Sequence, residues 1–275
     1  IRWERSPKPI ISSDLAFGER GFRSPRVLEK DGLYYLFYNA KKDGAYKQSA
    51  AVSGSPSGPF RNDGKPLVMS KDDDQAVRIG ARPVVDPATE KTYLVVTRCR
   101  KGNHIVLYEC TIGDGRVEVD VDSERTLLSP EADWERNVGR VVEGGDIFFH
   151  NGYYYLIYSG GNYNTAYGEG YAVSRDIKGP YERAKTNPVL FSTRSAWGNG
   201  DASIVWSEGG SEGVIVYFRH TSRQSVRPLN VCVDRCKFVP DPAGGADRLE
   251  ISGPTVTPQP CFASALQSET KRHDR

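Results

Sequence analysis

The chain has 275 residues, with 37 Lys and Arg against 35 Asp and Glu, so its formal net charge is +2. A balance this close to neutral gives no reason to expect nucleic acid or an anionic membrane as a partner. No run of 18 apolar residues occurs, which argues against a transmembrane helix. The 28 Gly, 17 Pro and 15 Tyr favour strands joined by turns.

The chain begins with IRWERSPKPI, which has neither a methionine nor the apolar core of a signal peptide, so we expect a processed protein or a fragment. Its cysteine count is odd, which predicts no simple disulfide framework. Cys232 and Cys236 have a C-x3-C spacing with no second pair nearby, which favours strand or core positions over a zinc site.

Four turn-and-strand units follow one another along the chain. The first is DGLYYLFYNA (31–40), and TEKTYLVVT (89–97) is a weaker second copy. NGYYYLIYSG (151–160) repeats the first closely, and EGGSEGVIVYF (208–218) is the fourth. Asp-Gly and Asn-Gly turns accept positive φ and favour hairpins. The turns recur about every 60 residues, which indicates an internal repeat.

The first and third units share more than their strands. SPSGPF (55–60) matches DIKGPY (176–181), and KPLV (65–68) matches NPVL (187–190), in the same order. Repeated units of three or four antiparallel strands predict the blades of a β-propeller. A β-sandwich is the alternative all-β fold, but it does not need the same strand and loop to recur in order. No long segment has a helical period, and 131–143 comes nearest.

The segment EGGDIFFHNGYYYLIYS (143–159) resembles the five-bladed β-propellers of glycoside hydrolase family 43, the arabinofuranosidase, xylosidase and arabinanase group. In that family a blade begins with Glu-Gly-Pro, a turn and a Tyr-Tyr-Leu strand, and here Gly145 replaces the proline. GEGYAVSRDIKGPYERAKTNPVL (168–190) is similar to the family's next strand and its Gly-Pro-Tyr loop, and GNGDASIVW (198–206) to a later strand. The resemblance covers roughly 22–260.

The resemblance implies an all-β fold, a propeller of the five-bladed type in one domain over 1–275, with about four blades recognisable in this chain. The blade units lie near 22–70, 80–128, 142–190 and 198–240, and a C-terminal segment, 250–262, closes or packs on the ring. Either the family's first blade lies upstream of this sequence, or the active site is degenerate.

The resemblance also implies inverting hydrolysis. One carboxylic acid protonates the leaving oxygen, and a second carboxylate, about 6.5–9.5 Å away, activates water. A third carboxylate tunes the acid. Glu143 matches the general acid, and burial at its strand entrance would raise its pKa so that it can donate a proton. The alternative is a surface glutamate before a turn.

The other two carboxylates of the family do not match. Arg82 takes the place of the tuning aspartate, and Asp86 falls in the following turn. Arg82 binds sugar hydroxyls or a substrate carboxylate, or is a solvated turn residue. A salt bridge from it to Glu143 would lower the pKa of the acid and oppose proton donation. Ser24 and Arg26 stand where the family has an acidic motif in another blade, so the catalytic base is absent or lies upstream.

Further candidate site residues lie in the last unit. Asp201 replaces a central histidine of the family, and is either a ligand for a structural calcium or a turn residue in GNGD. His220 and Arg227 match positions that line the family's pocket. Trp197 and Tyr163 lie on loops expected to rim the pocket, where an aromatic face can stack on a sugar or only pack. We expect the stacking role for Trp197 alone.

We therefore expect a glycosidase acting on arabinose- or xylose-containing polysaccharides or oligosaccharides, with water as co-substrate and no required cofactor. The alternative is a propeller that binds carbohydrate without hydrolysing it, and a third, weaker reading is a protein-interaction propeller. The substrate class implies an extracellular protein. The sugar, the linkage, exo or endo action and the oligomeric state stay open.

Overall fold

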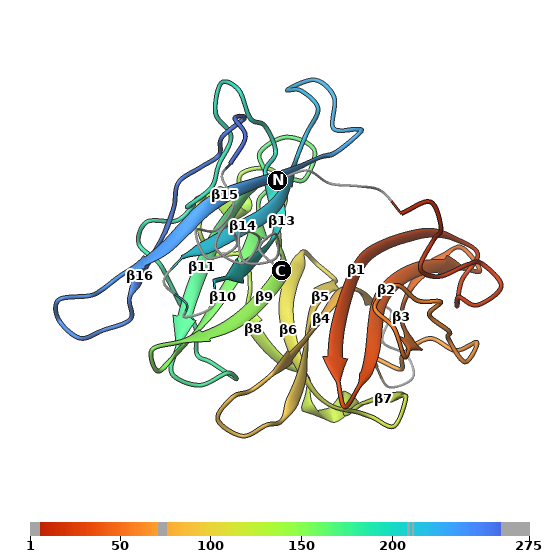
Figure 1. The fold of residues 1–275 in the computed structure, drawn as a ribbon. Coiled ribbons are helices and arrows are strands. Elements are labelled where there is room, and N and C mark those ends of the chain that lie inside the picture. Colours follow the sequence, from red (N-terminus) through yellow and green to blue (C-terminus); the bar gives the residue numbers. More distant parts are fainter. Residues whose placement is uncertain (1–5, 71–75, 208–209, 211, 260–275) are drawn as a thin grey trace, which may run out of the picture.

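The structure, a computed structural model, describes residues 6–70, 76–207, 210 and 212–259. Within them the chain forms four antiparallel sheets in chain order, placed side by side as blades (Figure 1). Blade 1 consists of β1 (Arg20–Lys30), β2 (Leu33–Lys42) and β3 (Ala45–Ser53). Blade 2 consists of β4 (Val77–Val85), β5 (Thr92–Cys99), β6 (Asn103–Gly113), β7 (Arg116–Val119) and β8 (Arg125–Leu128).

Blade 3 consists of β9 (Val142–His150), β10 (Tyr153–Gly160), β11 (Gly168–Ser174) and the short β12 (Glu182–Arg183). Blade 4 consists of β13 (Gly200–Trp206), β14 (Gly213–Arg219), β15 (Asn230–Val239) and β16 (Arg248–Ile251). The expected C-terminal segment therefore starts inside β16, which pairs with β15, and its residues 260–262 lie outside the described part.

The four predicted turn-and-strand units are the second strands of the four blades, β2, β5, β10 and β14. The predicted hairpin turns are confirmed at both Gly-containing dipeptides, because Asp31 and Gly32 have φ of 52° and 74°, and Asn151 and Gly152 have φ of 47° and 82°. Lys30 pairs with Leu33 across the first turn, which fixes the register that buries the Tyr-rich face of β2.

The helical candidate at 131–143 contains only α1 (Asp133–Arg136). Its Glu135 is fully buried and accepts hydrogen bonds from Tyr158 Oη at 2.7 Å and Arg183 Nε at 2.8 Å, so this turn is fastened to blade 3. No helix among the described residues has the length and apolarity needed to cross a membrane.

Apolar clusters join each blade to the next. Phe37 of blade 1 packs with Leu94 of blade 2, Leu107 of blade 2 with Leu156 of blade 3, and Ile157 of blade 3 with Ile215 of blade 4. Among the described residues no such cluster joins blade 4 to blade 1. Those two blades meet instead through an ion pair on the inner side, Arg26 with Asp201 at 3.3 Å.

Each blade's first strand contains an irregularity of the same kind, a β-bulge near its beginning. The register shifts there in all four strands, and a residue at the bulge of each has a left-handed backbone; β1 has a further one at Gly21. The bulge residues are Ser24 (φ 54°), Gly80 (φ 67°), Gly144 (φ 61°) and Asp201 (φ 55°). Bulges re-aim side chains, so equivalent residues of the four blades converge at this end of the strands.

Candidate active site

The four bulge residues line one pocket of about 530 Å³. Arg23 and Glu143, the residues that precede two of the bulges, also line it. The bulge thus places Glu143 in the pocket because the local kink turns the strand entrance inward. Its neighbour Gly144 permits this backbone, and the Gly144 amide is fixed by donating to Thr97 Oγ1 at 3.1 Å.

The carboxylate of Glu143 is held by two donors from different blades. Asn103 Nδ2, at the beginning of β6, donates to Oε2 at 2.7 Å, and Tyr167 Oη donates to Oε1 at 2.7 Å. Burial raises the pKa of Glu143 above its ordinary value, and the negative charge of Asp201 acts in the same direction. The two hydrogen bonds favour the ionised form and oppose this shift, but burial outweighs them.

Tyr167 is a packed residue rather than a mobile one. It is buried, and its ring stacks on Phe218 of blade 4 with centroids 6.0 Å apart. A side chain on Gly200 would overlap the Tyr167 ring, because a Cβ there would lie 2.0 Å from it. The contact between blades 3 and 4 therefore orients the hydroxyl that holds the acid.

Two residues beyond each bulge lies a second inner layer, made of Arg26, Arg82, Asp146 and Ser203. Arg82 is buried and binds two other members of this layer: Nη1 contacts Asp146 Oδ2 at 3.2 Å and Ser203 Oγ at 3.2 Å. The same nitrogen donates to the Ala202 carbonyl at 2.6 Å. Arg82 does not pair with Glu143, so it does not lower the acid's pKa through a salt bridge.

Asp201 lies above this layer and faces the pocket. Its Oδ1 accepts a short hydrogen bond from Arg82 Nη2 and pairs with Arg26 Nη2 at 3.3 Å. Burial acts to raise the pKa of Asp201, but Arg82 and Arg26 outweigh it and hold the pKa below its ordinary value. At neutral pH this carboxylate is ionised.

Glu169 of β11 is the acidic group beneath the pocket. It is fully buried, accepts from Ser159 Oγ at 2.6 Å and the Ala202 amide at 3.3 Å, and its Oε2 has no hydrogen-bond partner. Burial raises its pKa to about 8, although the nearby Arg82 charge acts to lower it. Glu169 is therefore protonated at neutral pH, and its position below the surface keeps it out of the pocket lining.

The structure brings some of the predicted binding residues into the pocket and not others. Arg227 lines it, and so does Tyr163, which we expected only to pack. Trp197 and His220 do not line it: the Arg223 guanidinium lies 5.0 Å over the Trp197 ring, and His220 is buried beside Gly198. Their proposed contacts with sugar stay predictions that this geometry does not favour.

Arg82 likewise does not line the pocket, because its guanidinium is occupied by protein partners. Asp86 lies in the turn after β4, as expected, and accepts from Tyr154 Oη at 2.5 Å. The sequence reasoning missed Arg23, Asn103 and Tyr167. Alignment of FRSP with VEGG as equivalent bulges would have found Arg23, which occupies in blade 1 the position of Glu143 in blade 3.

The surroundings of Asp201 do not fit the calcium that the sequence suggested. Two guanidinium groups already neutralise the carboxylate, and a divalent cation beside them would be repelled. No group of three metal-ligating side chains occurs among the described residues.

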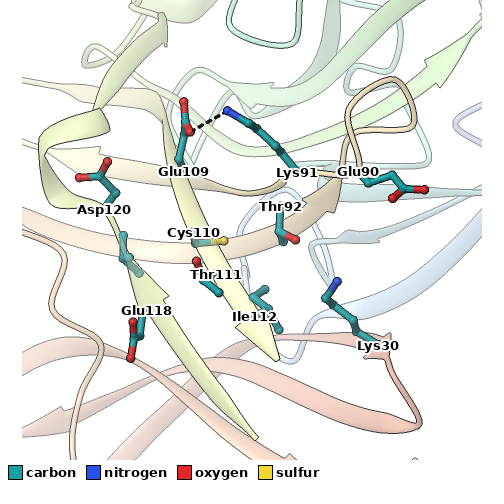
Figure 2. A pocket seen from close by; sticks show the side chains of 11 residues that line it. Lys30, Glu90, Lys91, Thr92, Glu109, Cys110, Thr111, Ile112, Glu118 and Asp120 are labelled. Atoms are coloured by element: carbon teal, nitrogen blue, oxygen red, sulfur yellow. Dashed lines mark ion pairs between the residues drawn. The ribbon is translucent and has the colours of Figure 1, made fainter. Parts of the chain in front are cut away.

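A second pocket, of about 580 Å³, lies at the opposite ends of the strands, since Lys30 ends β1 and Thr92 begins β5. Figure 2 shows its charged side chains, with Lys91 paired to Glu109 at 3.5 Å. Glu109 also binds Lys178, and burial contributes less to its pKa than that hydrogen bond, so the pKa is lowered. Glu90, Glu118 and Asp120 are exposed.

Comparison with known proteins agrees with this geometry. The sequence model of glycosyl hydrolases family 43 matches residues 3–242. An endo-1,4-beta-xylanase from Bacteroides thetaiotaomicron is similar in structure, with a TM-score of 0.77 and 27% identity, over 90% of this chain and 81% of that one. A thermostable family-43 glycoside hydrolase has the same score and identity, over 91% and 82%.

Among curated proteins, xylosidase/arabinosidase 43A from Humicola insolens is 37% identical over 65 residues, which is 23% of this chain. That match spans 20% of the relative's own length.

Proposed function

Because the chain belongs to glycosyl hydrolase family 43, we propose that it hydrolyses glycosidic bonds in arabinose- or xylose-containing polysaccharides or oligosaccharides, with Glu143 as the general acid. The observation that carries the proposal is a half-buried carboxyl group with a raised pKa in an accessible polar pocket. A raised pKa favours the protonated form, which can deliver its proton to a leaving oxygen. The names of a similar xylanase and a similar xylosidase/arabinosidase support the substrate class.

In the proposed reaction Glu143 protonates the glycosidic oxygen while a water molecule attacks the anomeric carbon from the opposite face. Asn103 and Tyr167 hold the two oxygens of the acid and then stabilise the carboxylate that remains after proton transfer. Arg23 and Arg227 line the same pocket and offer donors for sugar hydroxyls. Polysaccharides of this kind lie outside cells, so the proposal includes an extracellular protein.

Glu143→Gln tests the assignment, because an amide of the same shape cannot donate the proton. We expect kcat/KM on aryl arabinofuranosides or xylosides with a poor leaving group to fall by about 10²–10⁴. Proton NMR of the first product should show the inverted anomer. Glu109→Gln in the second pocket is the matched control and should hydrolyse at the wild-type rate. Equal turnover by Glu143→Gln would contradict the proposal.

A second function is carbohydrate binding without hydrolysis. The observation that favours it is that Arg82 and Arg26 stand at positions where other members of the family have acidic residues. This alternative predicts that the wild-type protein binds xylo- or arabino-oligosaccharides in calorimetry yet releases no product from them.

A further inference from the structure

The pocket contains two carboxyl groups whose surroundings shift their pKa values in opposite directions. Among the described residues, Glu143 and Asp201 are the acidic side chains that line it. Two other acids lie close but are excluded: Asp146 belongs to the layer below and pairs with Arg82, and Glu169 is fully buried. A proton-accepting group that can reach a water molecule in this pocket therefore has to be Asp201, if it is a carboxylate of the described chain.

The backbone at Asp201 is specialised for this placement. The equivalent bulge position is glycine in two of the other blades, Gly80 and Gly144, since φ near +55° disfavours most side chains. Aspartate tolerates this region at a modest cost. The Asp201 amide donates to Ser159 Oγ at 2.8 Å, which fixes the bulge, and the side chain stays 36% exposed. The bulge thus presents a carboxylate where other blades present none.

The contacts of Asp201 leave one oxygen available. Oδ1 accepts hydrogen bonds from both Arg82 and Arg26, whereas Oδ2 receives no hydrogen bond from the described residues. The arginines also favour the ionised form, while burial favours the neutral form of Glu143. A pair of carboxyl groups whose environments push their protonation in opposite directions is the pattern of an acid and its complementary base.

We propose that Asp201 is the general base of this site, accepting a proton from the attacking water while Glu143 protonates the leaving oxygen. This inference rests on the proposed function. The water oxygen forms a bond to the anomeric carbon, and its proton passes to Asp201. The glycosidic C–O bond breaks, and its electron pair takes the proton of Glu143. Exchange with solvent returns a proton to Glu143 and removes one from Asp201, so water and glycoside give two hydroxyl compounds.

Arg82 and Arg26 are positioning residues in this scheme. They hold Oδ1 and keep the carboxylate ionised, which lets Oδ2 face the pocket. Their presence explains why arginine occupies two inner positions: each supplies the positive charge that an aspartate at this bulge requires. Arg26 and Arg82 stand where the family has acids in blades 1 and 2, and the additional acid, Asp201, stands in blade 4.

The test uses an aryl glycoside with a 2,4-dinitrophenyl leaving group, which departs without protonation. Glu143→Gln should hydrolyse this substrate at nearly the wild-type rate and lose activity only on poor leaving groups. Asp201→Asn should lose about 10²–10⁴ in kcat on both substrates, because water activation is still needed. Azide, which attacks without a base, should restore turnover of Asp201→Asn and give a glycosyl azide of inverted configuration.

The asparagine variant is expected to fold, since asparagine tolerates positive φ and its oxygen still accepts from Arg82. Thermal unfolding checks this, and Asp201→Gly, which matches the bulges of blades 2 and 3, is the second variant. Asp146→Asn is the matched control: it removes another carboxylate from Arg82 but should show no azide response.

Full activity of Asp201→Asn, or a loss that azide does not restore, would overturn the assignment of the base while leaving Glu143 as the acid. If instead Glu143→Gln keeps full activity on poor leaving groups, the proposed function itself fails. Formation of the glycosyl azide by Asp201→Asn, but not by Asp146→Asn, supports the assignment of Asp201 as the general base.

Discussion

The two pockets at opposite ends of the strands have similar volumes, about 530 and 580 Å³, yet their carboxyl groups have different surroundings. In the pocket of Glu143, burial raises the pKa of that acid, whereas two arginines hold the pKa of Asp201 below its ordinary value. In the pocket of Figure 2, Glu109 pairs with Lys91 and Lys178, and the remaining acids are exposed. Water screens the charges of these exposed side chains.

The difference comes from the bulges rather than from composition. All four first strands bulge at the Glu143 end, which brings side chains from four blades together around one pocket. The other pocket has its charges on strand ends and turns, where long side chains remain in solvent. Pocket size alone therefore does not identify a candidate site, whereas carboxyl groups whose pKa values are shifted in opposite directions do.

The largest expected effect on stability comes from removing the charge that organises the inner layer. Arg82→Met leaves Asp146 and part of Asp201 without a partner, and should lower the free energy of unfolding by about 3 kcal/mol at neutral pH. Lys91→Ala removes an exposed partner in the other pocket and should cost less than about 1 kcal/mol. Urea unfolding measures both. Equal losses would erase the contrast between the pockets.

A smaller effect should appear as pH dependence. Folded Glu169 keeps its proton up to about pH 8, whereas its ordinary pKa is 4.5. The folded state then binds more protons than the unfolded state, so stability falls as pH rises between these values. Glu169→Gln should remove about 2 kcal/mol of that fall from about pH 6 to about pH 7.5.

Glu109→Gln is the control for this measurement, because a lowered pKa contributes no slope in that pH range. Denaturant unfolding at the two pH values gives the difference. A slope that persists in Glu169→Gln would show that Glu169 is ionised in the folded protein.

The smallest effect concerns the acid itself. Tyr167→Phe removes a donor that favours ionised Glu143, so the pKa of Glu143 should rise further. Since the protonated form is the active one, the basic limb of the kcat/KM profile should move to higher pH, by up to about one unit. Tyr154→Phe, whose hydroxyl donates to Asp86 outside the pocket, should leave that limb in place. A shift to lower pH would contradict the assigned direction.

Much of the fold follows from local sequence. The Asp-Gly and Asn-Gly turns set two hairpins, and the four recurring turn-and-strand units form the second strands of the blades. These features were predictable because a hairpin depends on a few adjacent residues, whose allowed φ and alternating polarity can be read directly. No long helix was expected, and within the nearest candidate, 131–143, α1 comprises Asp133–Arg136, a turn that tertiary contacts of Glu135 stabilise.

The candidate site divides differently. Glu143 was predictable because it belongs to one continuous motif, and Arg227 because a family position matched it. Asn103, Tyr167 and Arg23 were not, since each reaches the pocket from a different blade. Nor could the sequence show that Arg82 would pair with Asp201 and Asp146 instead of reaching substrate.

The sequence by itself therefore determined the repeat, the turns and the position of Glu143, because each is encoded within a few neighbouring residues. The tertiary structure alone decided which charges meet, since Arg26, Arg82 and Asp201 are brought together from three blades. Protonation depends on burial and on the distance between charges, and neither quantity exists until the blades pack around a common centre.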